Sequence, residues 1–245
     1  MIAFNLRRGL VAVLAVAAAG MLLTACLKNN DTNTPQTPVA GLMAFNLAPD
    51  QPAVTVTLSG NSLTQTPLGY TSYTGTYQSI YTGNRAVESF ASQGSGSLAS
   101  TSYNFEENKY YSLFVVGFNN TYRNVIATDN FDSLTTSQGN AYIRYINAIA
   151  DTVSQPAVTI TAGGSGVVNE NAPFASVSEF KAVSPGSVSI AIKNGTAIDT
   201  SRTISVEQNK VYTILLTGVP GATDDTKKVQ IRFIENGTLS TTNGG

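Results

Sequence analysis

Short stretches in which apolar and polar residues alternate recur along the chain from residue 40 onward. The clearest cover residues 54–58, 158–161, 188–192 and 229–233, and they are rich in β-branched side chains. Alternation with a period of two is typical of antiparallel strands that bury one face. The pattern therefore predicts an all-β fold.

Two further segments depart from this alternation. Residues 110–116 and 211–216 are almost continuously apolar, as expected for a central strand that lies between two layers. Glycine and serine clusters at 94–97 and 163–166, and the pair Asn194-Gly195, are turn signals that separate the predicted strands.

The sequence repeats itself after about 100 residues. The run QPAVT at 51–55 recurs at 155–159, and NKYY at 108–111 recurs as NKVY at 209–212. Asn46 and Asp50 match Asn147 and Asp151. These matches predict two copies of one unit, at residues 40–136 and 137–236, followed by a polar tail at 237–245.

Each copy has the strand content of a small sandwich. In the first copy we expect strands near residues 42–47, 54–59, 73–80, 85–91, 98–105, 109–117 and 123–129. Seven short strands separated by turns predict two tandem antiparallel β-sandwich domains, either immunoglobulin-like or transthyretin-like. The chain has one Cys and no Trp, so it lacks the Cys…Trp…Cys signature of true immunoglobulin domains.

The run FNLAPDQPAVTV at residues 45–56 resembles the opening of a bacterial envelope domain, with an Asn-x-x-x-Asp start followed by Pro-Ala-Val. Phe180 and Pro185-Gly186 resemble the middle of that domain, and residues 212–218 resemble its closing strand. The family is the domain of unknown function forty-three ninety-seven, common in Bacteroidota lipoproteins. The resemblance covers both copies and implies no catalytic residues, since the family has no assigned chemistry.

The N-terminus has the features of a targeting signal. Arg7 and Arg8 precede an apolar run at residues 9–23, which ends in Leu23-Thr24-Ala25-Cys26. This order resembles a bacterial lipobox, in which the signal peptide (residues 1–25) is cleaved and Cys26 is acylated. Each buried methylene of the acyl chains would add about 0.8 kcal/mol of membrane affinity. The alternative is an ordinary secreted protein that carries Cys26.

Residues 26–39 then form a polar tether, because they are rich in Thr and Asn and interrupted by Pro35 and Pro38. Leu27 stands where an Asp would hold an enterobacterial lipoprotein in the inner membrane. That resemblance implies an outer-membrane, lipid-anchored protein that faces either the periplasm or the cell surface.

The composition excludes several kinds of catalytic site and metal site. The chain has no His, which excludes Ser-His-Asp and Cys-His catalysis and His-ligated zinc. A single Cys excludes internal disulfides and thiolate zinc sites. The net charge of −1 offers no basic field for nucleic acid. We therefore expect a non-enzymatic protein without a cofactor and without a nucleic-acid partner.

Four tyrosines form the most prominent group of candidate binding residues. On an extended strand Tyr73, Tyr77 and Tyr81 would share one face, with Tyr70 close by. Such a row favours either a flat platform for a sugar or protein partner, or packing within the core. Phe180 in the second copy, at the place of Tyr77, favours core packing for that position.

Three polar sites complete the set. Asp129 and Asp132 near the junction of the copies are weak calcium candidates, because a Ca²⁺ site needs at least six oxygen ligands. Asp132-Ser133-Leu134 and Asp151-Thr152-Val153 resemble the O-glycosylation signal of Bacteroidota, which makes Ser133 and Thr152 candidate acceptors. Polar turns are the alternative in both cases.

Together these features predict an outer-envelope lipoprotein that acts in binding, adhesion or scaffolding. Its partners would be the membrane, through Cys26, and a glycan or surface protein. A second hypothesis is a glycan-binding accessory lipoprotein of a polysaccharide-uptake system that uses residues 70–81. A third, an enzyme with two carboxylates, requires a cleft with two facing acids.

Overall fold

The computed structural model describes residues 37–92, 96–195 and 197–240. The predicted signal peptide, Cys26 and most of the tether lie outside the described residues, as do the last five residues. The described part is built of β-strands and one short 3-10 turn, which confirms the all-β prediction. None of its residues forms a helix long and apolar enough to cross a membrane.

The first copy contains nine strands in two sheets. One sheet has the order β5-β1-β8-β9, and the other has the order β3-β2-β6-β7 with β4 paired to β2. The strands are β1 (Val39–Asn46), β2 (Ala53–Leu58), β3 (Asn61–Ser62), β4 (Leu68–Gly69), β5 (Gln78–Tyr81), β6 (Gly83–Ala91), β7 (Ser97–Phe105), β8 (Tyr110–Phe118) and β9 (Thr121–Thr128).

The second copy has the same topology. Its sheets have the orders β13-β10-β16-β17 and β12-β11-β14-β15, and the turn η1 (Phe131–Ser133) lies between the copies. The strands are β10 (Ala141–Ile149), β11 (Ala157–Ala162), β12 (Ser165–Asn171), β13 (Lys181–Val183), β14 (Gly186–Asn194), β15 (Ile198–Val206), β16 (Lys210–Gly218) and β17 (Gln230–Thr238).

The strand order of each copy can be compared with that of an immunoglobulin domain. In an immunoglobulin domain the first two strands lie in the same sheet. Here β1 and β2 lie in different sheets, and so do β10 and β11. The first strand of each copy instead pairs in parallel with β8 or β16. The strand order of each copy therefore differs from that of an immunoglobulin domain, although the sandwich architecture is shared.

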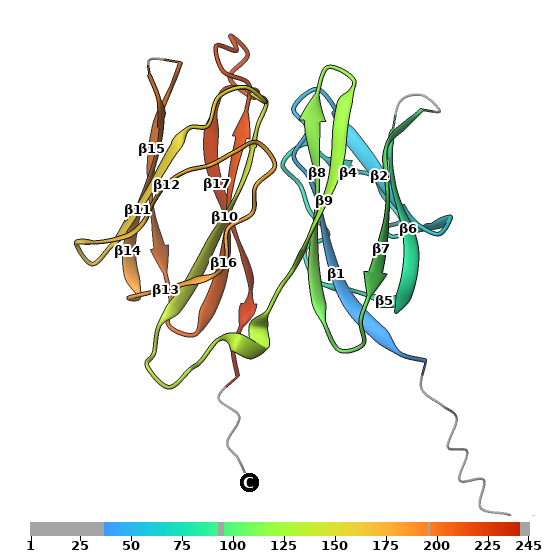
Figure 1. Cartoon of the computed structure of the whole chain (residues 1–245), viewed down its shortest axis with the longest axis horizontal. Helices are drawn as coiled ribbons and strands as arrows, with labels where there is room; N and C mark the ends of the chain where they lie inside the picture. The colour runs from blue at the N-terminus through green and yellow to red at the C-terminus, as the bar shows by residue number, and fades with distance from the viewer. Residues whose placement is uncertain (1–36, 93–95, 196, 241–245) are drawn as a thin grey trace, which may run out of the picture. The chain divides into compact units, whose positions relative to one another are not determined.

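The four sheets stack as four layers, with β10–β16 and β1–β8 in the two inner layers (Figure 1). One apolar cluster fills each sandwich. A third lies between the inner sheets and draws on both copies, with Phe45 and Phe114 from the first and Ile146 and Leu215 from the second. Apolar burial is the main favourable term in such contacts.

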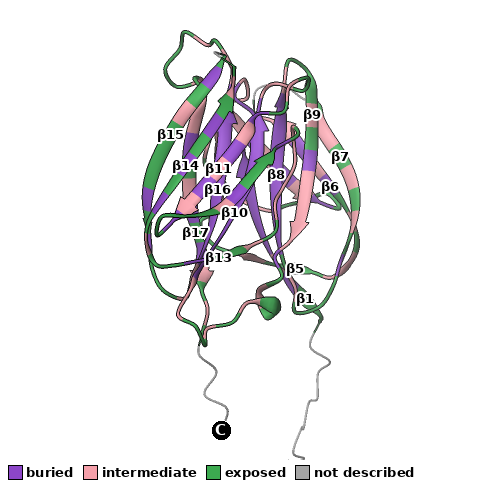
Figure 2. Cartoon of the chain, turned by 60° about the vertical axis from the view of Figure 1, so that its left-hand side comes forward, coloured by how far each residue is buried: buried purple, intermediate pink, exposed green. Residues whose placement is uncertain are grey.

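The central strands are consequently covered on both faces (Figure 2). All nine residues of β10 are buried, and β16 is buried after its first residue. This explains the continuous apolar runs, because neither face of these strands meets water. One covering layer is the other sheet of the same sandwich, and the second is the other copy.

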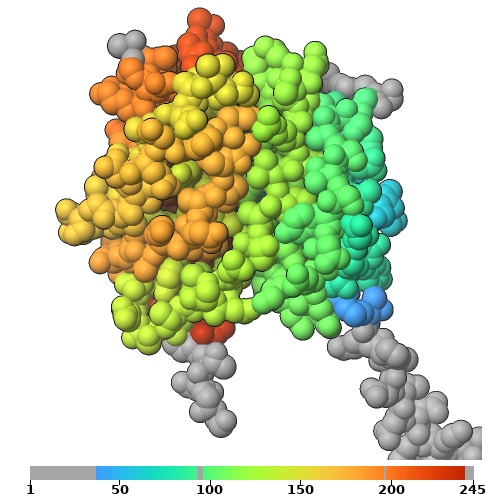
Figure 3. All heavy atoms as spheres, viewed as in Figure 1, coloured from blue at the N-terminus to red at the C-terminus, as the bar shows by residue number. Residues whose placement is uncertain are grey.

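The two copies contact each other in a reciprocal way. Thr71 and Ala175 each donate a backbone hydrogen bond to the opening Asn of their own copy, at 2.8 Å, and both have positive φ. The preceding residues, Tyr70 and Phe174, each contact the other copy. The Tyr70 hydroxyl lies 3.0 Å from that of Thr217, and the Phe174 ring lies beneath the Arg123 guanidinium. The two copies lie side by side along this contact (Figure 3), and each supplies a similar surface to it.

One predicted strand is wrong. Residues 73–80 do not form a continuous strand, since only Gln78–Tyr81 is β5 and Tyr73 makes an isolated bridge to Phe45. Gly75 between them has a φ of +80°, which bends the backbone away from the extended conformation. The side chains of Tyr73, Tyr77 and Tyr81 therefore do not follow the alternation of one strand.

Candidate functional site

Asn46 and Asn147, which the two copies share, have a structural role. The amide of Asn147 donates to the Ala172 carbonyl at 2.8 Å, and its side-chain oxygen accepts the Ile149 N–H at 3.1 Å. Asn46 makes the same kind of contacts in the first copy, and both side chains are fully buried. This Asn thus satisfies backbone groups that water cannot reach.

Replacing Asn147 with Ala should lower the free energy of unfolding by about 2 kcal/mol, because a buried carbonyl and a buried N–H lose their partners. Urea unfolding of the purified chain measures the difference. Asn169→Ala, on an exposed position of β12, is the matched control and should stay within about 0.5 kcal/mol of the parent. Equal effects of the two variants would contradict the assigned role.

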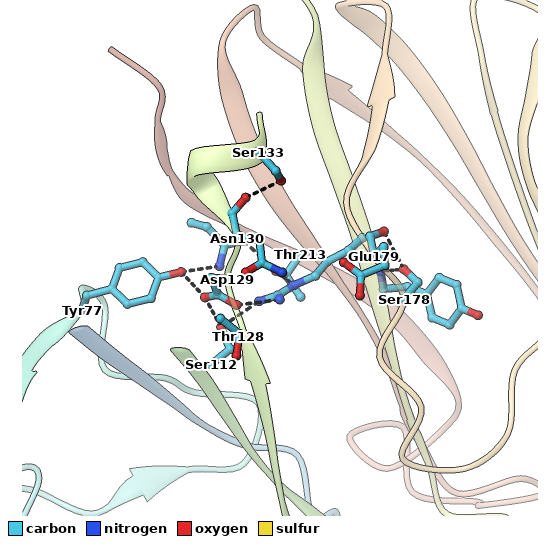
Figure 4. Close-up of polar contacts among 12 residues, drawn as sticks. Tyr77, Ser112, Thr128, Asp129, Asn130, Ser133, Ser178, Glu179 and Thr213 are labelled. Atoms are coloured by element: carbon cyan, nitrogen blue, oxygen red, sulfur yellow. Dashed lines mark hydrogen bonds and ion pairs between the residues drawn. The ribbon is translucent and has the colours of Figure 1, made fainter. Parts of the chain in front are cut away.

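A buried polar network joins the two copies near η1 (Figure 4). Its centre is Arg144 on β10, whose Nη1 lies 2.6 Å from Oδ1 of Asp129 in the first copy. The Arg144 side chain is 2% exposed and that of Asp129 is 0% exposed. Arg144 also donates from Nη2 to Ser112 Oγ at 2.8 Å and from Nε to Thr213 Oγ1 at 3.0 Å.

The carboxylate of Asp129 is held from two more directions. Tyr77 donates its hydroxyl proton to Oδ2 at 2.5 Å, and Ser112 donates to the same oxygen at 2.8 Å. Asn236 on β17 donates to the Tyr77 hydroxyl at 3.1 Å and accepts from Thr213 at 2.6 Å. The network thus supplies the hydrogen bonds that a buried ion pair needs to be tolerated.

Aromatic rings complete the surroundings of the guanidinium. Arg144 lies over the ring of Phe180 at 4.4 Å and near that of Phe114 at 5.8 Å. A guanidinium stacks favourably on an aromatic face. Tyr77 and Phe180, which match each other in the two copies, therefore both contact the buried ion pair. Tyr77 contacts Asp129, and Phe180 contacts Arg144.

This network was not predicted from the sequence, although one residue of β10 indicates it. Arg144 is the one charged residue in the apolar run of β10. Arg144 pairs with Thr213 in the sheet, as Met43 pairs with Ser112 in the first copy, so Arg144 stands where the first copy has Met. Asp129 and Asn236 likewise follow equivalent strand positions. The ion pair is a difference between the copies rather than a repeated motif.

The calcium hypothesis for Asp129 and Asp132 is not supported by these contacts. The guanidinium of Arg144 occupies the position beside Asp129 that a cation would take. Asp132 pairs instead with Lys109 at 2.7 Å on the surface. Within the described residues no group of three or more acidic, Cys or His side chains is placed to hold a metal ion.

Burial and the neighbouring Asp129 carboxylate raise the pKa of Tyr77 well above its ordinary value. The ordinary value is about 10. The folded protein then keeps this proton at a pH where the unfolded chain has lost it. Stability that is fully present below pH 10 should therefore fall as the pH rises further.

Tyr77→Phe tests this dependence. The parent should lose up to about 1.4 kcal/mol of stability per pH unit above pH 10 through this one group, and the variant should lose that part of the slope. Urea unfolding at pH 9, 10 and 11 measures both slopes. Tyr81→Phe is the matched control for loss of a hydroxyl. Unchanged slopes in Tyr77→Phe would contradict the assignment.

The four candidate tyrosines do not share one surface. Tyr73 stacks on Phe45 at 5.3 Å between the copies, and Tyr77 packs edge-on against Tyr110 and beside Asp129. Tyr70 reaches Thr217 of the second copy. Tyr81 differs, since it is 61% exposed. Three of the rings thus serve the contact between copies, and the single-strand platform is not what the chain forms.

The two candidate glycosylation sites lie on the surface. Ser133 is exposed in η1 and donates to the Asn130 carbonyl at 2.7 Å, and Thr152 is exposed in the loop after β10. Both hydroxyls are accessible to a modifying enzyme, and their glycosylation stays a prediction.

The domain of unknown function DUF4397 matches residues 40–154 and again residues 141–245. The chain belongs to the DUF4397 family. Its two DUF4397 copies are the two sandwiches, and the motif residues Asn46 and Asn147 have the structural role given above.

A solved structure from Bacteroides eggerthii, described as "a putative cell adhesion protein", is 12% identical and covers 82% of this chain and 95% of that chain, with a TM-score of 0.24. No curated protein matches the chain.

Proposed function

We propose that this DUF4397 protein is a lipid-anchored module of the bacterial outer envelope that binds a partner and performs no chemistry. The anchor is Cys26, and the polar residues 26–39 form its tether. The order of charged, apolar and small residues before Cys26 supports the anchor. Adhesion to a glycan or surface protein is the role we favour over scaffolding within the envelope.

The contact between the two copies is the observation that carries this proposal. Each inner sheet is covered on both faces, and the most deeply buried charges, Asp129 and Arg144, pair with each other across that contact. Of the candidate residues, Asp129 and Tyr77 are thus engaged in joining the copies. Loops, strand edges and the outer sheets remain for a partner, and these are where binding proteins of this architecture make contacts.

The outer sheets suit such display. Along β14 buried and exposed residues alternate, so that Ser187, Ser189 and Lys193 face outward. One polar face and one buried face are typical of an antiparallel sheet that borders water.

Protease treatment of intact cells tests the adhesion role. A C-terminal tag on the protein should be lost from intact cells if both copies face outward. Lysed cells are the control, because a resistant sandwich would survive in both samples. A tag that is protected in intact cells and digested after lysis would contradict adhesion and favour scaffolding in the periplasm.

A further inference from the structure

A groove lies in the first copy between β3 and β5, which are edge strands of its two sheets. Its volume is about 410 Å³, within the range of small-ligand sites. Leu58, Leu63 and Ile80 supply its apolar part. Tyr81, 61% exposed, also lines it.

The polar lining contains one charge and no acid. Arg85 lines the groove together with the amides of Asn61 and Gln78 and the hydroxyls of Ser62 and Ser79. Arg85 donates from Nε to the Tyr81 carbonyl at 3.4 Å, and its guanidinium lies 5.8 Å from the Tyr81 ring centroid. Among the described residues no carboxylate pairs with Arg85, and its terminal nitrogens make no hydrogen bond. They are thus available to an anion.

The two copies differ in the strand that carries Arg85. Gly83 begins β6 and Gly186 begins β14, both with positive φ. Two residues later the first copy has Arg85, whereas the second has Val188, which is fully buried. Counted from these glycines, Arg85 thus has a valine as its counterpart, whereas the pairing with β2 and β11 matches Val188 with Val87. Arg85 is half-buried and its hydrogen bond to the Tyr81 carbonyl is exposed, so its charge stays accessible from the groove.

We propose that this groove binds a sugar residue that bears a carboxylate. The planar guanidinium of Arg85 offers paired donors that match a carboxylate. The Tyr81 ring provides a flat apolar face for the C–H side of a sugar ring. Asn61 and Gln78 carry donors and acceptors for its hydroxyls. The inference rests on the proposed binding function and gives its glycan partner a chemical class and a place.

Calorimetric titration of the whole chain, purified in detergent, tests the proposal. The probes are oligomers of galacturonic acid, mannuronic acid and sialic acid, with methyl-esterified oligogalacturonate as the uncharged counterpart. At least one acidic oligomer should bind, and removal of its charge by esterification should abolish binding. Arg85→Gln and Tyr81→Ala should each weaken binding at least tenfold.

Lys193→Gln is the control for loss of one positive charge, since this residue is exposed on the second copy; it should leave the affinity unchanged. Circular dichroism confirms that each variant is folded. Decanoate, a carboxylate on an apolar chain, is the competing ligand. Binding of decanoate in place of the sugars, failure of every acidic oligomer, or binding insensitive to both groove variants would overturn the proposal.

These outcomes are separable from failure of the proposed function. The titration does not depend on where the protein lies in the cell, whereas protease treatment does not depend on what the groove binds. A negative titration with an outward-facing protein would refute the groove and leave adhesion through other surfaces.

Discussion

Arg144→Met should lower the free energy of unfolding by about 3–5 kcal/mol, the usual cost of leaving one partner of a buried ion pair alone. The variant keeps an apolar stem of similar length, so the loss comes mainly from the charge. Asp129 then retains its buried carboxylate with Tyr77 and Ser112 as donors but without the guanidinium. Urea unfolding at pH 7 measures the loss.

The double variant Arg144→Met with Asp129→Asn is the matched control. It places in each copy the residue that the other copy has at the equivalent position, Met43 and Asn236. A buried pair exchanged for neutral groups of similar volume is often close to neutral. We expect the double variant to recover most of the stability that the single variant loses. Losses that simply add would contradict the coupling across the two copies.

Gly218→Ala should be strongly damaging for so small a substitution, at about 3 kcal/mol or more. Gly218 ends β16 with a φ of +117°, and an added Cβ would lie 2.3 Å from the Lys228 carbonyl oxygen. Backbone strain and overlap with backbone atoms therefore add together. Thermal unfolding should show a Tm lowered by roughly 6–12 °C for a chain of this size.

Gly166→Ala is the control for that substitution. A Cβ at Gly166 would contact nothing within 4 Å, and the residue lies on β12. Its Tm should change by no more than about 2 °C. A Gly218→Ala protein as stable as the control would show that the end of β16 can relax, and that the Gly of the closing strand is not required by its geometry.

Much of the fold followed from local pattern. The alternating run at 54–58 is β2 and the run at 188–192 lies within β14, because a strand with one buried face alternates by necessity. The apolar runs correctly indicated strands covered on both faces. What they did not tell was that the second cover is the other copy, since burial in a run of residues carries no information about which layer supplies it.

The site was harder to predict, for two physical reasons. The Tyr73–Tyr81 segment contains a bend at Gly75, and one bend removes the shared face on which the platform depended. Arg144 and Asp129 are separated in sequence and differ from their counterparts in the other copy. Repeats draw attention to what the copies share, whereas both the ion pair and the Arg85 groove lie where the copies differ.

Metabolic labelling with a fatty acid, followed by membrane fractionation, tests the central claim that the protein is an anchored envelope module. The parent chain should carry the label and remain in the membrane fraction through a high-salt wash, since an acyl anchor is held by apolar burial and not by charge. Cys26→Ser should lose the label and the membrane association together. An unlabelled parent, or a Cys26→Ser protein that stays in the membrane fraction as the parent does, would contradict the account.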